Sequence, residues 1–273
     1  MRRTPGTPRL AYELVGTEGP PVLLVMGLGM RGRVWRPQVD ALRADHRVAT
    51  FDHRGVGESD PAPGSFTLAE LAGDALRVLD ALGWSSAHVV GVSMGGMVAQ
   101  ELALAAPERV RSLALIATHA GGAGAWRIPL GGLARFLAVN LGRDDERFGA
   151  LAALLYPRDF LRSFEREALL ARMREHLGGR APARTRQLQM RAVMRHDTRA
   201  RLAGLAVPTL VVSCGRDLLV RPARQRELAA RIPGARHVHL DEAGHGVIFQ
   251  CAPVLAGHLR RHVAAHEPEA AAR

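Results

Sequence analysis

Residues 88–104 of the chain have the sequence HVVGVSMGGMVAQELAL, and this stretch decides the fold. Its first part, H-V-V-G-V, is an apolar run that is typical of a buried β-strand. From Met94 onward the apolar side chains recur at helical spacing. A single serine, Ser93, stands at the junction, with Gly91 and Gly95 two positions to either side. The stretch therefore predicts a strand that turns sharply into a helix at Ser93.

The segment from Gly91 to Gly95 fits the pattern G-x-S-x-G, in which a strained strand-to-helix turn exposes a nucleophilic serine. The backbone approaches itself closely at such a turn, so the neighbouring residues must be small. The turn also leaves the Met94 N–H free at a helix N-terminus, where the helix dipole favours negative charge. An ordinary N-cap serine is the alternative interpretation.

A serine hydroxyl becomes a good nucleophile only when a base takes its proton and an acid orients that base. His245 lies between two glycines in the loop after the last predicted strand, and Asp217 directly follows the predicted strand before it. Asp241 is the rival acid, but it precedes His245 on the same strand exit. The strand after the one that carries the serine ends in A-T-H-A, without a carboxylate. We therefore predict a triad of Ser93, Asp217 and His245, in the chain order serine, acid, histidine.

Acyl transfer also needs backbone donors for the oxyanion that forms on the attacked carbonyl. The loop Gly27–Met30 follows a predicted strand and contains two glycines, so its amides are exposed. We predict that the Leu28 N–H pairs with the Met94 N–H in this role. A plain turn is the alternative.

Six apolar or β-branched runs predict strands, and the segments between them carry helical patterns. The predicted strands are residues 21–26, 47–52, 87–92, 110–117, 207–213 and 235–240, and the predicted helices are Leu68–Leu82, Met94–Ala105 and Ala223–Ile232. Thr67, with Glu70 three residues later, predicts a capping box at the start of the first helix. Apolar strands that alternate with helices indicate an α/β fold with a parallel sheet buried on both faces.

The alternation lapses between Thr118 and Leu205, where the sequence is mostly helical and carries sixteen arginines between Trp126 and Arg201. We interpret this span as a helical insertion over one edge of the sheet; an ordinary run of surface helices is the alternative. The predicted organisation is a core of residues 1–117 and 206–266, a helical cap insertion of residues 118–205, and a frayed tail of residues 267–273.

The formal net charge of +11 first suggests a nucleic-acid partner, but the residues do not support one. All 37 basic residues are arginines, which indicates a coding bias, and only 4% of the residues are aromatic. The lack of lysine excludes Schiff-base chemistry and a P-loop. We therefore predict a small-molecule substrate and no nucleic-acid partner.

Other classes of site and location are also disfavoured. Cys214 and Cys251 have no metal-binding or redox spacing, so free thiols are expected. His237 and His239 with Asp241 could suggest a metal pair, but this short pattern arises readily by chance, and we predict no metal and no cofactor. No apolar run approaches the roughly 20 residues of a membrane-spanning helix, and no secretory signal is present, so a cytoplasmic protein without a membrane partner is expected.

Together these residues resemble the α/β-hydrolase fold family across nearly the whole chain. The matching blocks are M-G-L-G-M-R-G-R-V-W, F-D-H-R-G-V-G-E-S, G-V-S-M-G-G-M-V-A-Q, A-P-E-R-V-R-S-L-A-L, G-R-D-L-L-V and A-G-H-G. Two patterns, S-M-G-G-M-V-A-Q-E-L-A and G-L-G-x5-W-x2-Q, are similar to the 3-oxoadipate enol-lactonase branch. The chain departs from many members at Met26, where they have histidine, and at Gln250, where they have glutamate.

The resemblance implies an α/β-hydrolase fold, a triad on Ser93, His245 and Asp217, no cofactor, and a structural turn at residues 52–55. We expect a serine hydrolase that cleaves a small ester or lactone through an acyl-enzyme on Ser93. C–C bond hydrolysis, acyl transfer and cofactor-free haloperoxidase or perhydrolase chemistry use the same triad and stay open. A non-catalytic ligand-binding protein is a further alternative. The arginines of residues 118–205 would favour an anionic substrate, but a solvated surface that reflects the coding bias is the preferred interpretation, and the sequence leaves the oligomeric state open.

Overall fold

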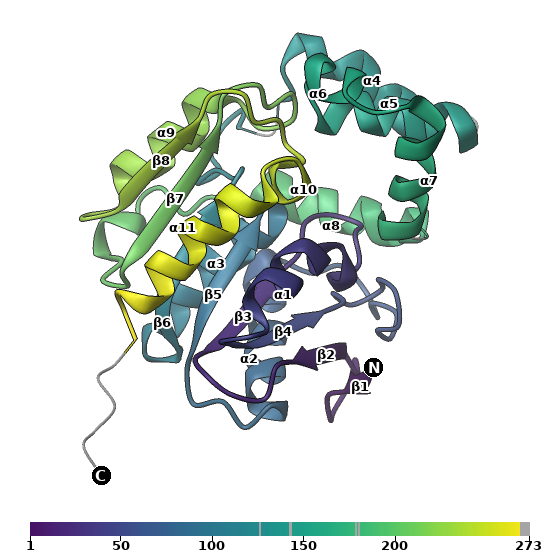
Figure 1. Cartoon of the computed structure of the whole chain (residues 1–273). Coiled ribbons are helices and arrows are strands. Elements are labelled where there is room, and N and C mark those ends of the chain that lie inside the picture. The colour runs from purple at the N-terminus through teal and green to yellow at the C-terminus, as the bar shows by residue number, and fades with distance from the viewer. Residues whose placement is uncertain (126, 142–143, 178, 180, 268–273) are drawn as a thin grey trace.

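The computed structural model describes residues 1–125, 127–141, 144–177, 179 and 181–267 (Figure 1). In this part of the chain, eight strands form one sheet in the order β1-β2-β4-β3-β5-β6-β7-β8. The strands are β1 (Arg2–Arg3), β2 (Ala11–Val15), β3 (Pro21–Val25), β4 (Arg47–Phe51), β5 (Ala87–Val92), β6 (Val110–Ile116), β7 (Thr209–Cys214) and β8 (Arg236–Leu240). All neighbours from β4 to β8 pair in parallel, so the predicted mostly parallel sheet is confirmed.

Helices connect and cover these strands. They are α1 (Arg36–Leu42), α2 (Leu68–Ala81), α3 (Met94–Ala105), α4 (Leu130–Leu141), α5 (Asp144–Leu155), α6 (Arg158–Arg162), α7 (Arg166–Leu177), α8 (Ala183–Arg195), α9 (Pro222–Arg231), α10 (Val247–Gln250) and α11 (Ala252–Ala264), with short 3₁₀ turns at Gly32–Trp35, Pro107–Arg109 and Leu202–Gly204. None of the described helices is long and apolar enough to cross a membrane.

The six predicted strands match β3 to β8 within two residues at either end. The sequence did not reveal β1 and β2, which pair antiparallel at one edge of the sheet, with Tyr12 opposite Phe51. The edge strand β1 has only two residues, both exposed, and β2 has its two buried residues at one end and the charged Glu13 in its middle. A strand this short, and one interrupted by a charge, carry only a weak signal in the sequence.

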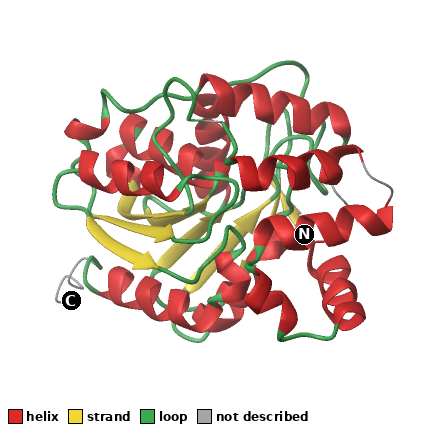
Figure 2. Cartoon of the chain, turned by 90° about the horizontal axis from the view of Figure 1, so that it is seen from above, coloured by secondary structure: helices red, strands yellow, loops and turns green. Residues whose placement is uncertain are grey.

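The hydrophobic core has two halves, one on each face of the sheet. Successive strand residues point to opposite faces, so Leu23 packs in the cluster with α2 and α3, whereas Leu24 packs in the cluster with α1 and α11. Figure 2, which views the chain from above, shows helices on both sides of the strands. Burial on both faces explains why the central strands β3, β5, β6 and β7 are mostly apolar.

Five helices, α4 to α8, lie between β6 and β7 in the sequence, and we call them the inserted helices. In Figure 1 helices α4 to α7 gather beyond the sheet, and α8 returns toward it. Part of this group has an apolar cluster of its own, which includes Val139, Leu151, Tyr156 and Met173. The interpretation as a cap insertion stays a proposal, which these positions support.

The predicted tail begins at Glu267, and residues 268–273 lie outside the described residues. Glu267 itself is held, because its carboxylate pairs with Arg111 at 2.5 Å and with His88 Nε2 at 2.7 Å. These contacts attach the end of the chain to β5 and β6.

The capping box at the start of α2 gives a test of the fold. Thr67 Oγ1 accepts a hydrogen bond from the Glu70 N–H at 3.2 Å, and the Glu70 carboxylate accepts one from the Thr67 N–H at 2.7 Å. The second bond is the main reason why the pKa of Glu70 lies below its usual value. We expect Thr67→Ala to lower the free energy of unfolding by about 1 kcal/mol in urea titrations, because one helix N–H loses its acceptor. Thr67→Ser, which keeps the hydroxyl, should leave it nearly unchanged, and equal losses in the two variants would contradict this account.

Candidate active site

Ser93 occupies a strained turn between β5 and α3. Its backbone has φ 55° and ψ −124°, and the positive φ is unusual for a residue other than glycine. The turn is held on both sides. The Ser93 N–H donates to the carbonyl of Ile116 at 2.9 Å, while its own carbonyl accepts from the Gly96 N–H at 2.9 Å and from Thr118 Oγ1 at 2.7 Å. A strained conformation of this kind persists only where the surrounding structure fixes it.

The glycines around Ser93 are needed for close backbone contacts. A Cβ on Gly91 would overlap the carbonyl of Gly95, and a Cβ on Gly95 would overlap the carbonyl oxygen of Val25 at the end of β3. The predicted requirement for small residues at this turn is therefore confirmed, and it allows α3 to pack directly against β3.

Asp217 and His245 meet after β7 and β8. His245 Nδ1 lies 2.8 Å from Asp217 Oδ2, and both side chains are buried. Three further donors fix the carboxylate, namely the N–H groups of Leu219 (2.7 Å) and Val220 (2.9 Å) on Oδ1 and Gln225 Nε2 (2.9 Å) on Oδ2. Because this carboxylate accepts from Nδ1, the Nε2 of a neutral His245 carries no proton and can act as a base.

The inserted helices close directly over the His245 loop. The Gly246 N–H donates to the carbonyl of Leu155, the last residue of α5, at 2.8 Å. A Cβ on Gly246 would overlap the ring of Tyr156, and a Cβ on Gly244 would lie 2.5 Å from the Leu155 oxygen. The two glycines beside the histidine thus make room for the end of α5.

Gln250, one of the two departures from the family pattern, holds the same loop from the other side. Its Oε1 accepts from the Gly244 N–H and its Nε2 donates to the Glu242 carbonyl, each at 2.8 Å. The amide therefore acts as donor and acceptor at once, which a carboxylate could not do.

The three predicted triad residues lie at the carboxyl ends of β5, β7 and β8, which form one edge of the parallel sheet. The structure joins Asp217 to His245 by a hydrogen bond. Within the described residues no hydrogen bond joins Ser93 Oγ to His245. Such bonds are often long in a free enzyme and tighten with substrate, so the complete triad stays a prediction.

The predicted oxyanion loop, residues 27–30, lies against the serine. A Cβ on Gly27 would lie 3.3 Å from Ser93 Cβ and 3.8 Å from Ser93 Oγ. The next glycine, Gly29, donates its N–H to Gln189 Oε1 of α8 at 2.7 Å. No hydrogen bond of the Leu28 N–H is found among the described residues, and Met94, as the first residue of α3, has no preceding helical turn to accept its N–H. The oxyanion role of these two N–H groups therefore stays a prediction.

His237 and His239, which were considered as a metal pair, contact Ser213 instead. His237 Nε2 and His239 Nδ1 each lie 2.7 Å from Ser213 Oγ, and His239 Nε2 lies 3.3 Å from Asp241 Oδ1. Across the described ranges, no group of three or more histidine, cysteine, aspartate or glutamate side chains could hold a metal ion.

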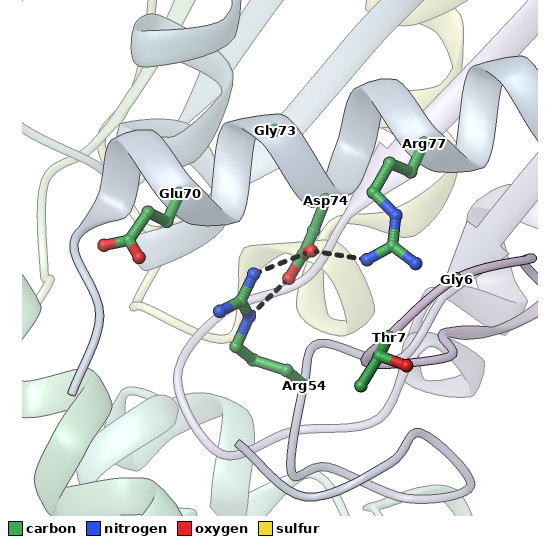
Figure 3. Close-up of a pocket in the computed structure, with 7 residues that line it drawn as sticks. All are labelled: Gly6, Thr7, Arg54, Glu70, Gly73, Asp74 and Arg77. Atoms are coloured by element: carbon green, nitrogen blue, oxygen red, sulfur yellow. Dashed lines mark hydrogen bonds and ion pairs between the residues drawn. The ribbon is translucent and has the colours of Figure 1, made fainter. Parts of the chain in front are cut away.

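The segment 52–55 makes structural contacts. Arg54 forms two hydrogen bonds with Asp74 of α2, at 2.7 and 2.9 Å, and Arg77 lies 3.4 Å from the same carboxylate (Figure 3). These three residues line a surface hollow together with Gly6, Thr7, Glu70 and Gly73, and no predicted catalytic residue lines it. His53 Nε2 lies 2.9 Å from the carbonyl of Met26, so this turn supports the end of β3.

Sequence reasoning missed Thr118, which holds the Ser93 carbonyl, Gln225, which holds Asp217, and Gln189, which holds Gly29. A signal existed for Gln225, because it shares the buried face of α9 with Leu228 and Ala229, where a polar residue is out of place. The other two depend on partners far away in the sequence and carried no comparable signal.

The crowding at Gly95 gives a second prediction. We expect Gly95→Ala to lower the free energy of unfolding by about 3 kcal/mol, because the new methyl group meets a fixed backbone oxygen. Gly73 in α2 is the matched control, since a Cβ there meets nothing within 4 Å. Gly73→Ala should raise the stability by up to about 1 kcal/mol. Urea unfolding followed by circular dichroism measures both, and a Gly95→Ala protein as stable as the unmodified chain would show that the turn tolerates side chains.

Buried histidines give a third prediction. His119 follows β6, accepts the Gly121 N–H at Nδ1, and has its pKa lowered from 6.5 to about 4, mainly by burial and then by His196. Burial likewise lowers the pKa of His262 to about 4. Between pH 6.5 and 4 the unfolded chain therefore binds more protons than the folded one, so stability falls as the pH falls, with a slope of up to about 1.4 kcal/mol per pH unit for each histidine.

Urea unfolding at stepped pH values checks this dependence. We expect His119→Gln to reduce the slope of the free energy of unfolding against pH, between pH 6.5 and 4, by about the contribution of one histidine. An unchanged slope in this variant would mean that His119 is not kept neutral by the fold.

Comparisons with known proteins agree with the architecture. The sequence model of the alpha/beta hydrolase fold matches residues 20–251. A protein of Azorhizobium caulinodans with the provisional name carbamate hydrolase RutD is 37% identical over 249 residues, 88% of this chain and 89% of that protein. Two crystal structures are similar. A hydrolase from Pseudomonas aeruginosa PA01 is 32% identical with a TM-score of 0.82, and the match covers 96% of this chain and 97% of that chain. The enol-lactonase from Burkholderia xenovorans LB400 is 29% identical with a TM-score of 0.78, and the match covers 94% of this chain and 97% of that chain. The chain therefore belongs to the alpha/beta hydrolase fold family, and the predicted resemblance is confirmed.

Proposed function

We propose that the protein is a serine hydrolase that cleaves a small-molecule ester or lactone through an acyl-enzyme on Ser93. The observation that carries this proposal is the buried pair of Asp217 and His245, joined at 2.8 Å at the sheet edge where the strained Ser93 turn lies. A carboxylate with four donors fixes the imidazole in one orientation, which is the preparation that a general base needs.

Each step of the reaction has a group for it. Ser93 Oγ attacks the substrate carbonyl while His245 Nε2 takes its proton, and Asp217 stabilises the imidazolium that forms. The N–H groups of Leu28 and Met94 donate to the oxyanion. His245 then protonates the leaving group, and a water molecule activated by the same histidine releases the acyl group.

The inserted helices, as part of a cap insertion of residues 118–205, would form the lid of this site. Leu155 contacts Gly246 beside the base, and α8 contacts Gly29 in the oxyanion loop. Above the base, the ring of Tyr156 lies 5.2 Å from that of Phe160 and 6.0 Å from that of Phe249. The Tyr156 ring also packs against Gly246, next to the base.

The comparisons support two neighbouring choices of substrate. The similarity to an enol-lactonase favours a lactone. The name of the Azorhizobium relative favours a carbamate as the second candidate, since the same serine can attack a carbamate carbonyl and form a carbamoyl-enzyme. C–C bond cleavage, acyl transfer and perhydrolysis differ in the acyl acceptor or the bond broken rather than in the triad.

Incubation with a fluorophosphonate should label Ser93, and a panel of p-nitrophenyl esters, lactones, carbamates and vinylogous diketones should identify the bond that is cleaved. We expect Ser93→Ala and His245→Ala to lower kcat by more than about 1,000-fold, because the nucleophile and the base act as a unit. Ser65→Ala, at an exposed serine, is the matched control and should keep full activity. Turnover that survives Ser93→Ala would refute the proposed function.

A further inference from the structure

The α8 helix presents two donor side chains to the oxyanion loop. Arg186 and Gln189 are three residues apart, so they lie on the same face of the helix. Both contact Gly29. Gln189 Oε1 accepts the Gly29 N–H at 2.7 Å, and a Cβ on Gly29 would lie 3.3 Å from Cγ and Cδ of Arg186. This face of α8 is therefore packed on the loop that adjoins Ser93.

The amide of Gln189 is only half used. The side chain is fully buried, and because Oε1 must face the Gly29 donor, the orientation of the amide is fixed. Its Nε2 has no hydrogen-bond partner among the described residues. Burying an N–H₂ group without an acceptor costs free energy, so an oxygen of a ligand or of water that accepts from it would recover that cost.

The guanidinium of Arg186 is likewise not neutralised. Its one hydrogen bond within the described part of the chain goes to the carbonyl of Ala181 at 2.7 Å, and no carboxylate there pairs with it. Partial burial and the nearby charge of Arg147 lower its pKa below the usual value. Two other partly buried arginines differ, because Arg54 pairs with Asp74 and Arg111 with Glu267.

A third donor lies next to the same loop. The Nε of Arg31, one residue beyond the predicted oxyanion loop, is buried and has no partner among the described residues. Arg186 and Gln189, which contact Gly29, and Arg31, which follows the loop in the sequence, thus supply donor groups without acidic partners. Such a set of donors suits a group that brings negative charge and several acceptor oxygens.

We propose that Arg186 and Gln189 bind a carboxylate of the substrate, so that the enzyme prefers esters or lactones whose acyl part carries a carboxylate. The inference rests on the proposed function. Gln189 has a second role as a positioning residue, because its Oε1 holds the loop that supplies the Leu28 N–H. Guanidinium and amide donors together match the two oxygens of a carboxylate.

A pair of isosteric esters tests the preference. The mono-p-nitrophenyl ester of succinic acid has a carboxylate where p-nitrophenyl 4-methylpentanoate has two methyl groups on carbon. We expect kcat/KM to be about 10–100-fold higher for the succinate ester at low ionic strength, since a hydrogen bond to a charged group has this effect. The preference should shrink as salt is added, because the attraction is electrostatic.

Variants assign the preference to residues. Arg186→Gln should remove most of the preference by lowering kcat/KM for the succinate ester, while kcat/KM for the neutral ester changes by less than about threefold. Arg186→Lys, which keeps the charge, should restore part of the preference. Arg184→Gln, at an exposed position of the same helix, is the matched control and should behave as the unmodified protein. Gln189→Met should lower kcat for both esters, because the oxyanion loop loses its acceptor, and it should lose more on the succinate ester.

The possible failures are distinct. If the protein cleaves the neutral ester through Ser93 but shows no preference for the charged one, or if Arg186→Gln changes both esters equally, the carboxylate site is refuted and the proposed function stands. If Ser93→Ala keeps its turnover, the proposed function is refuted and the inference with it. Should Arg186→Gln fail to fold, Arg186→Met provides the same comparison. The preference of the unmodified protein for the succinate ester also tests the carboxylate site without any variant.

Discussion

The turn at Ser93 is the constraint on which the rest of the structure depends. A serine with φ 55° requires close backbone contacts on every side, and the chain supplies them through glycines at positions 91 and 95 and through the hydroxyl of Thr118. These contacts bring α3 against the end of β3. Because β3 ends there, the loop that follows it lies beside the serine, so one local feature positions both the proposed nucleophile and the loop of the predicted oxyanion donors.

The remaining groups of the site reach it through the parallel sheet. Strands β7 and β8 end at the same edge as β5, so the loops that carry Asp217 and His245 emerge together. The inserted helices leave the sheet after β6 and return before β7, which places them next to these loops. Their contacts with Gly29 and Gly246 couple the cover of the site to the predicted oxyanion loop and to the base at once.

Sequence patterns predicted the parts of the molecule whose signals are local. The strands β3 to β8 are apolar runs, α3 follows a motif, and the capping box of α2 spans four residues. Asp217 and His245 were predicted because the residues of such a triad lie in loops after strands. The structure shows the contact between these two side chains. The edge strands β1 and β2 were missed since they lack a two-sided apolar pattern.

The supporting polar residues show a different limit. Gln189 lies 160 positions from its partner Gly29, and Thr118 lies 25 from Ser93, so their roles exist only once the chain is folded. The sequence of an arginine-rich helix does not show whether one of its glutamines holds a buried loop or faces solvent. Only the packing of α8 on the loop distinguishes the two cases.

The net charge of +11 carries little information by itself, because all basic residues are arginine and many lie on the surface. Pairing is more informative. Arg54 and Arg111 are partly buried and each has a carboxylate partner, so their charges stabilise the fold. Arg186 is desolvated without such a partner beside the most constrained turn of the molecule. A partly buried cation without a carboxylate partner keeps a positive potential where an anionic group can use it, and the cost in stability is what a binding site requires.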